Sequence, residues 1–95
     1  MIKVDGKSHD TLVLDGEWFE KLRHGQQRMR LPASTFVSVE TDVFERRKKL
    51  FGGDKEQLIR TAFRFDAHLV GFVTEVENQA AVQEIIAGLE AARDS

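Results

Sequence analysis

The sequence predicts a mainly β fold of six or seven antiparallel strands followed by one C-terminal α-helix. Turn dipeptides recur every nine or ten residues near the N-terminus, and short alternating runs lie between them. After residue 77 the apolar period changes from two to about 3.6. Because 95 residues suffice for one domain and not for two, we expect residues 1–95 to form a single domain, with strands within residues 1–76 and a helix at about 78–93.

Glycine-containing dipeptides mark the expected turns. They are Asp5-Gly6, Asp15-Gly16 and His24-Gly25, and Gly52-Gly53-Asp54 follows later in the chain. Tight hairpins favour such pairs, because a type I′ turn needs positive φ at both central residues and glycine adopts it without Cβ strain. The regular spacing favours antiparallel hairpins over βαβ units.

Alternation of apolar and polar side chains predicts the strands. The pattern is clearest in residues 58–65, where the expected inward residues are Ile59, Thr61, Phe63 and Phe65. Shorter runs of the same kind occupy residues 11–14, 35–40 and 68–76, the last of them after a short turn at Asp66-Ala67. Phe19 and Phe36 are expected in the core, as is Trp18.

The C-terminal segment has the pattern of an amphipathic helix. Apolar residues recur at helical spacing at Val82, Ile85, Ile86 and Leu89. We expect Asn78 to cap the start of this helix, since its side chain can accept a hydrogen bond from a free backbone N–H group. Gly88 costs about 1 kcal/mol relative to Ala inside a helix, and we attribute its presence to a close approach to the sheet.

The segment at residues 41–57 allows two interpretations. Its apolar residues form two pairs spaced seven apart, Val43 with Leu50 and Phe44 with Phe51. These residues would share one face of a two-turn helix, or they would belong to a strand and a loop. The sequence leaves both interpretations open.

Composition excludes several classes of function. The chain has no cysteine, which removes disulfide frameworks, thiolate zinc sites, iron–sulfur clusters and cysteine nucleophiles. Its N-terminus lacks the basic, apolar and small-residue order of a secretory signal, and no run of 18 apolar residues is present. We therefore expect a cytoplasmic protein with no transmembrane segment.

Several short motifs accompany the expected strands. They are Leu14-Asp15-Gly16-Glu17-Trp18, Leu22-Arg23-His24-Gly25, the step from Arg28 to Ser34, Val37-Ser38-Val39-Glu40 and Ala67-His68-Leu69-Val70-Gly71-Phe72. With the terminal helix, they resemble the pleckstrin-homology-like domains of small uncharacterised actinobacterial proteins, over most of the chain. The resemblance implies a bent antiparallel barrel capped at one open end by the helix, a habit of binding proteins or lipids, and no enzyme activity. The charged segment at residues 43–57 departs from that pattern.

No set of residues has the spacing of a catalytic or cofactor-binding motif. Ser8-His9-Asp10 contains the residue types of a catalytic triad, but adjacent side chains point apart, so we interpret it as a polar turn. The histidines at positions 9, 24 and 68 have no repeated ligand spacing. We expect a protein that is not an enzyme and that uses no cofactor and no metal.

Charge is segregated along the chain. Residues 1–20 carry two lysines against five acids, residues 21–64 carry eleven lysines and arginines against five acids, and residues 65–95 carry one arginine against six acids. A basic centre between acidic ends can steer an anionic partner to one face or let copies of the chain associate. A solvated surface with no such role is the alternative.

The candidate partner-binding residues belong to this basic centre. Four cations flank the His24-Gly25 turn, namely Lys21, Arg23, Arg28 and Arg30. The others are the run Arg46, Arg47, Lys48 and Lys49 with the neighbouring aromatic residues Phe44 and Phe51. We expect a module that binds a protein partner or self-associates through these residues, or through sheet edges left open between residues 40 and 58. Binding of anionic lipid or nucleic acid through the same cations is the alternative.

Overall fold

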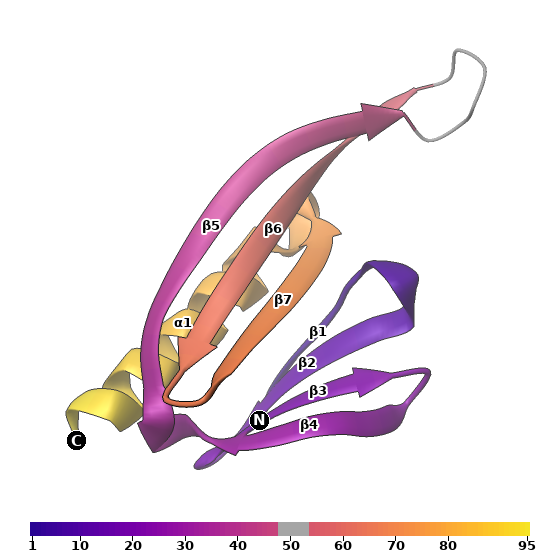
Figure 1. Cartoon of the computed structure of the whole chain (residues 1–95). Coiled ribbons are helices and arrows are strands. Elements are labelled where there is room, and N and C mark those ends of the chain that lie inside the picture. Colours follow the sequence, from indigo (N-terminus) through magenta and orange to yellow (C-terminus); the bar gives the residue numbers. More distant parts are fainter. Residues whose placement is uncertain (48–53) are drawn as a thin grey trace.

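Seven strands and one α-helix make up the part of the chain that the computed structural model describes, residues 1–47 and 54–95 (Figure 1). The strands are β1 (Ile2–Asp5), β2 (Asp10–Asp15), β3 (Trp18–Arg23), β4 (Gln26–Pro32), β5 (Phe36–Arg47), β6 (Lys55–Phe65) and β7 (His68–Glu75). The short 3-10 turns are η1 (Lys7–His9), η2 (Ala33–Thr35) and η3 (Val76–Asn78), and the helix is α1 (Gln79–Asp94). The predicted order of strands and helix is confirmed. Within the two described ranges, no helix combines the length and the apolar character of a membrane span.

The strands form two separate antiparallel sheets. The first sheet has the order β1-β2-β3-β4 and the second has the order β5-β6-β7. In the described part of the chain the strand ladder does not continue from one sheet to the other, so the expectation of a barrel is wrong in that the sheets do not close.

The turn η2 accounts for the break between β4 and β5. The Ala33 N–H donates to the Glu17 carbonyl at 2.7 Å, and Thr35 Oγ1 donates to the Pro32 carbonyl at 2.7 Å. These backbone groups are therefore not free to extend the ladder of β4 into β5. The chain changes direction at η2 and begins a new sheet (Figure 1).

Two of the predicted turns have glycine at a position with positive φ. The β3–β4 turn is His24-Gly25, whose φ values of 51° and 74° suit a type I′ turn. The β2–β3 turn consists of Gly16 and Glu17, and Gly16 has φ of 59°. The hairpin predicted at His24-Gly25 is confirmed, and the one predicted at Asp15-Gly16 forms with its turn one residue later.

Asp5-Gly6 does not form a tight hairpin turn, because the three residues of η1 join β1 to β2. Gly6 has an extended backbone and packs against β7. A Cβ atom at this position would overlap the Phe72 ring and the Val73 carbonyl oxygen. The glycine is therefore required by a contact between the two sheets and not by a turn.

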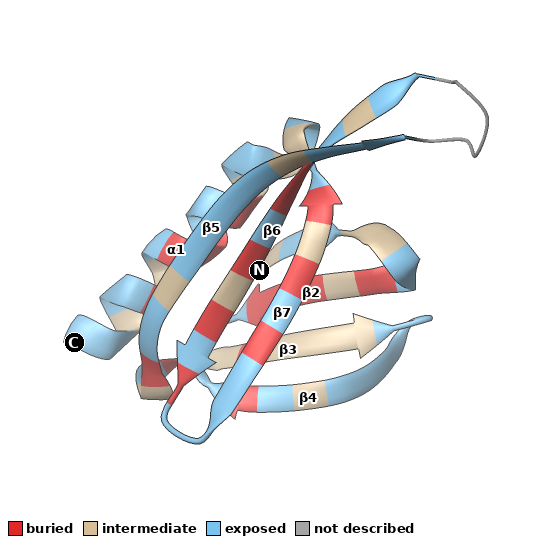
Figure 2. Ribbon diagram, turned by 45° about the horizontal axis from the view of Figure 1, so that its top comes forward, coloured by how far each residue is buried: buried red, intermediate tan, exposed pale blue. Residues whose placement is uncertain are grey.

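The two sheets face each other across an aromatic core. The Phe19 ring of β3 lies with its centroid 5.2 Å from that of Phe63 and 4.9 Å from that of Phe65, both in β6. Figure 2 shows the alternation of buried and exposed residues along β6 and β7. All four residues predicted to point inward from residues 58–65 are buried, and both arginines between them are exposed. Trp18, by contrast, is only half-buried.

The helix α1 packs on η2, β1, β2 and β5. Its buried residues are the predicted Val82, Ile85, Ile86 and Leu89. Gly88 lies so close to Leu14 of β2 that a Cβ atom at position 88 would overlap the leucine side chain. The predicted close approach of helix and sheet is confirmed.

Asn78 does not cap the helix as predicted. No side-chain capping bond is present at the start of α1, because the Asn78 amide donates to the Asp5 carbonyl at 3.2 Å and to Thr74 Oγ1 at 2.9 Å. Thr74 Oγ1 in turn donates to the same Asp5 carbonyl at 2.7 Å. Asn78 therefore joins the end of β1 to the segment before the helix.

The segment that the sequence left open continues the two longest strands. β5 extends to Arg47 and β6 begins at Lys55, so residues 41–47 and 55–57 are strand and not helix. Leu50 and Phe51, which the helical interpretation used, lie outside the described residues. In Figure 1 the distal ends of β5 and β6 reach beyond the other strands.

Gly6→Ala should lower the free energy of unfolding by about 1–3 kcal/mol, because the added methyl group would overlap a buried ring and a carbonyl oxygen of β7. Urea titration of the variant and the wild type measures the difference. Gly71→Ala is the matched control, since no atom lies within 4 Å of its added methyl group. Equal losses in the two variants would contradict the proposed contact.

The Thr61 side chain is fully buried, and its hydroxyl has no hydrogen-bond partner among the residues that the structure describes. An unpaired buried hydroxyl costs about 1 kcal/mol or more. Thr61→Val should therefore raise the free energy of unfolding by about 1 kcal/mol. Thr74→Val is the contrasting variant and should lower it, because Thr74 Oγ1 donates to the Asp5 carbonyl. The same urea titration checks both, and a loss in both variants would contradict the assignment.

Candidate functional site

Two cations of β3 surround one carboxylate of β2. Arg23 Nε donates to Asp10 Oδ1 at 2.8 Å, and Lys21 Nζ lies 3.7 Å from Asp10 Oδ2. Lys21 and Arg23 are two residues apart in a strand, so they share a face, and Asp10 is the cross-strand partner of Arg23. Phe19 precedes them on this face. The inward face of β3 is therefore apolar at Phe19 and charged toward the C-terminal end of the strand, at Lys21 and Arg23.

Lys21 also links the two sheets, since its Nζ donates to the Gly71 carbonyl of β7 at 2.8 Å. Beside it lies a hollow of about 380 Å³ lined by Lys21, Arg23, Arg28 and Met29. No acidic residue is among these four, although Asp10 contacts two of them. The hollow therefore has an excess of positive charge.

The electrostatics of Asp10 follow from this geometry. The hydrogen bond from Arg23, together with the charge of Lys21, holds the pKa of Asp10 below its ordinary value even though partial burial acts in the opposite direction. The same hydrogen bond raises the pKa of Arg23. Asp10 is thus a carboxylate at neutral pH, and it fixes both cations at the edge of the hollow.

The structure separates Arg30 from the other three cations predicted around the His24-Gly25 turn. Arg30 is the cross-strand partner of Glu20, so it lies on the opposite face of the sheet from Lys21. There its guanidinium stacks on the Trp18 ring, 3.8 Å from the centroid. Through this cation–π contact Trp18 lies on the outer face of the sheet. The prediction that Trp18 belongs to the core is wrong.

In the second predicted cluster, at the β5–β6 hairpin, Arg46 is paired within the chain. Arg46 Nε donates to Glu56 Oε1 at 2.8 Å, and Lys7 Nζ lies 3.0 Å from Glu56 Oε2 and 3.3 Å from Glu75. Arg47 is exposed. Lys48, Lys49 and Phe51, which the sequence also nominated, lie outside the described residues.

Phe44 is half-buried. Its ring lies 5.3 Å from the guanidinium of Arg60, which also forms an ion pair with Asp42 at 2.6 Å. The Phe44 ring therefore packs against a cation of β6.

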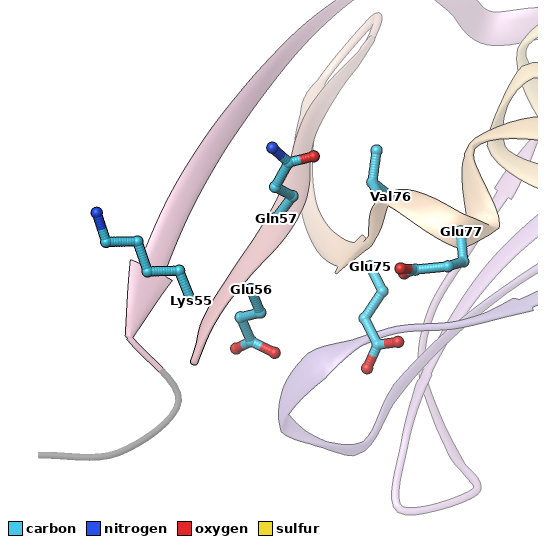
Figure 3. Close-up of a pocket in the computed structure, with 6 residues that line it drawn as sticks. All are labelled: Lys55, Glu56, Gln57, Glu75, Val76 and Glu77. Atoms are coloured by element: carbon cyan, nitrogen blue, oxygen red, sulfur yellow. The ribbon is translucent and has the colours of Figure 1, made fainter. Parts of the chain in front are cut away.

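A second hollow, of about 230 Å³, lies where β6 meets the end of β7, and glutamates dominate it (Figure 3). Its lining residues are Lys55, Glu56, Gln57, Glu75, Val76 and Glu77. Hydrogen bonds from Arg46 and then Lys7 lower the pKa of Glu56. With three glutamates and one lysine in its lining, this hollow is acidic.

The sequence did not predict that His9 and His24 meet. Their rings stack with centroids 4.3 Å apart, and the His24 N–H donates to the His9 carbonyl at 3.0 Å. The two residues belong to different turns, so no local spacing signals the contact. Among the described residues, no group of three or more His, Cys, Asp or Glu side chains is arranged to hold a metal ion.

Comparisons of the chain with known protein families, with curated proteins and with solved structures gave no match.

Asp10→Asn should destabilise the protein near neutral pH, because Lys21 and Arg23 lose their carboxylate. Since the pKa of Asp10 is lowered in the folded state, the unfolded chain takes up the proton first as pH falls. The stabilisation is complete above the ordinary pKa of about 4 and is lost as pH falls through the folded-state pKa.

The difference in stability between the wild type and Asp10→Asn should therefore narrow below about pH 4. Urea titrations between about pH 7 and pH 3 measure it. Asp15→Asn is the control, because Asp15 is exposed and makes no ion pair with another described residue. A difference for Asp10→Asn that stays constant with pH would contradict the charged pairing.

Proposed function

We propose that this chain is a non-enzymatic, cytoplasmic binding module of the pleckstrin-homology-like type, and that it binds an acidic segment of a protein partner at the hollow beside the β3–β4 hairpin. The order of four strands, three strands and a C-terminal helix supports the fold assignment. The lack of cysteine supports the cytoplasmic assignment.

The excess of positive charge in one hollow carries the proposal. Three cations and Met29 surround a space that no acidic residue lines. The Arg23 side chain is 49% exposed while it binds Asp10, so it retains N–H groups for a second carboxylate. Arg28 is exposed. Arginine suits this role because its planar guanidinium can bind a carboxylate through two hydrogen bonds.

The internal contacts of Arg30 and Arg46 favour this hollow over the positions of those two cations. Arg46 is bound to Glu56, and Arg30 is stacked on Trp18. A partner at either place would compete with a contact inside the chain. Lys21 and Arg23 also have contacts inside the chain, with Asp10 and the Gly71 carbonyl. Arg28, in contrast, makes no ion pair with another described residue, so an acidic segment can bind it without displacing an internal ion pair.

Titration of a labelled glutamate-rich peptide with the full chain, followed by fluorescence anisotropy, tests the proposal. Arg28→Ser should weaken binding about tenfold, which corresponds to one charge-assisted hydrogen bond of about 1.4 kcal/mol. Arg64→Ser is the matched control, because Arg64 is an exposed arginine of β6 that does not line this hollow. Equal effects of the two substitutions would show a response to net charge alone and would remove the hollow as the site.

Vesicles with phosphatidylserine and a single-stranded oligonucleotide serve as competing probes in the same assay. Stronger binding of either one than of the peptide would replace the protein partner with an anionic lipid or a nucleic acid. Oligonucleotide binding through phosphates should fall steeply between about 50 and 200 mM salt. Loss of vesicle binding in Arg28→Ser but not in Arg64→Ser would assign the lipid to the same hollow.

A further inference from the structure

The outer edge of β5 is open along its distal half. β5 is the end strand of its sheet and pairs only through its other edge, with β6. The helix covers the start of the open edge, where Arg93 donates to the Val37 carbonyl at 2.9 Å. From Glu40 to Arg47 every residue except half-buried Phe44 is exposed. No backbone hydrogen bond joins this stretch to a described residue outside its sheet.

This edge lacks several of the features that prevent strands from pairing. Natural sheets protect their edges with charged side chains, especially lysine, and with proline, bulges or covering elements. The charged residues of this edge are of both signs, so they oppose strand pairing only where like charges face each other. Residues 39–47 contain neither lysine nor proline, and the irregular pairing of β5 lies earlier, between Phe36 and Ser38. A long edge with free N–H and C=O groups is a template for another strand.

The charges of β5 favour a second copy of the chain in antiparallel orientation. The first half of this stretch carries Glu40 and Asp42, and its end carries Arg46 and Arg47. Antiparallel copies place the acidic half of each strand beside the basic half of the other. Parallel copies in register would place like charges opposite each other, which is destabilising.

We propose that two copies of this chain pair through the distal half of β5, around a two-fold axis at Val43, and form one continuous six-stranded sheet. In this register Val43 faces its own copy, and Glu40 faces Arg46 of the other chain on both sides of the axis. Val43 is 55% exposed in the single chain, so pairing removes apolar surface from water. Such an interface is self-complementary, as two-fold symmetry requires.

A like charge disfavours the neighbouring register toward the N-terminus. Residues that face each other in an antiparallel pair lie on the same face of the sheet, so a two-fold axis must pass through a residue and not between two residues. An axis at Asp42 would place the two Asp42 carboxylates opposite each other, which is destabilising.

A two-fold axis at Phe44 avoids like charges, but it would pair Asp42 with Arg46. These two residues already bind Arg60 and Glu56, at 2.6 Å and 2.8 Å. Glu40 makes no ion pair with another described residue. Both registers use Arg46, which binds Glu56 within its own chain, but only the axis at Phe44 also uses the paired Asp42. The axis at Val43 is favoured because it disturbs one internal ion pair instead of two and provides Glu40 with a cation.

A single introduced cysteine tests the interface directly, because the chain has none of its own. Val43→Cys should form a disulfide-linked dimer under mild oxidation, since residues that face each other in an antiparallel pair lie about 4.5–5.5 Å apart at Cα, within the range of a disulfide. Non-reducing electrophoresis against time gives the rate of linkage.

Thr41→Cys is the matched control on the same exposed strand. In the proposed dimer the two residues at position 41 are separated by roughly 13 Å along the strands, so linkage should be at least about tenfold slower than at position 43. Equal rates at the two positions would indicate random collision and overturn the proposal. Faster linkage of Phe44→Cys than of Val43→Cys would overturn the proposed register.

Exchange of charges provides a second test that does not depend on oxidation. Glu40→Arg would place the new arginine opposite Arg46 of the other chain at each end of the interface. The repulsion between the two arginines should reduce the dimer fraction measured by sedimentation equilibrium. Adding Arg46→Glu restores opposite charges and should recover much of that fraction. If Glu40→Arg does not weaken the dimer, the proposal is overturned. It is also overturned if the wild-type protein keeps the mass of one chain, 10.8 kDa, at protein concentrations up to about 1 mM. This surface does not include the hollow of β3 and β4, so either proposal can fail alone.

Discussion

Packing of the Phe19 ring against Phe63 and Phe65 joins two sheets whose strands share no ladder in the described part of the chain. The helix packs its apolar face into the same core. Hydrogen bonds also join the two sheets. Lys21 of the first sheet donates to the Gly71 carbonyl of the second, and the Asp5 carbonyl accepts hydrogen bonds from Thr74 and Asn78. Because side chains hold the sheets together, loss of this aromatic contact would affect the helix and both sheets at once.

The same contact places the cationic hollow. Alternate residues of β3 share one face, so the strand that contributes Phe19 to the core must point Lys21 and Arg23 toward the same side, beyond the core. The charges of Lys21 and Arg23 would be costly to bury without an opposite charge. Asp10, on the adjacent strand, provides that opposite charge. The hollow is thus the charged margin of the core, and the packing of the sheets fixes its position.

Local pattern was sufficient to predict much of this fold. Alternation of apolar residues marks β6, helical spacing marks α1, and the pair His24-Gly25 marks a hairpin. The break between the sheets depends in part on the hydrogen bond from Ala33 of η2 to Glu17 of the β2–β3 turn, which no local pattern contains. For the same reason the sequence grouped Arg30 with Lys21, although the register of β3 and β4 places them on opposite faces. It also gave no sign that Asp10 anchors the cations, because that pairing depends on which strands lie side by side.

The ion pairs of Lys7 support the part of β5 and β6 that extends beyond the other strands. The distal parts of β5 and β6 form a two-stranded ribbon, and ribbons of this kind are marginal in water without further support. Lys7 in η1 binds Glu56 of β6 and Glu75 of β7, so it connects the base of the ribbon to the first sheet. Salt weakens partly exposed ion pairs more than it weakens apolar packing. We therefore expect added salt to weaken the link between the ribbon and the first sheet while it leaves the aromatic packing intact.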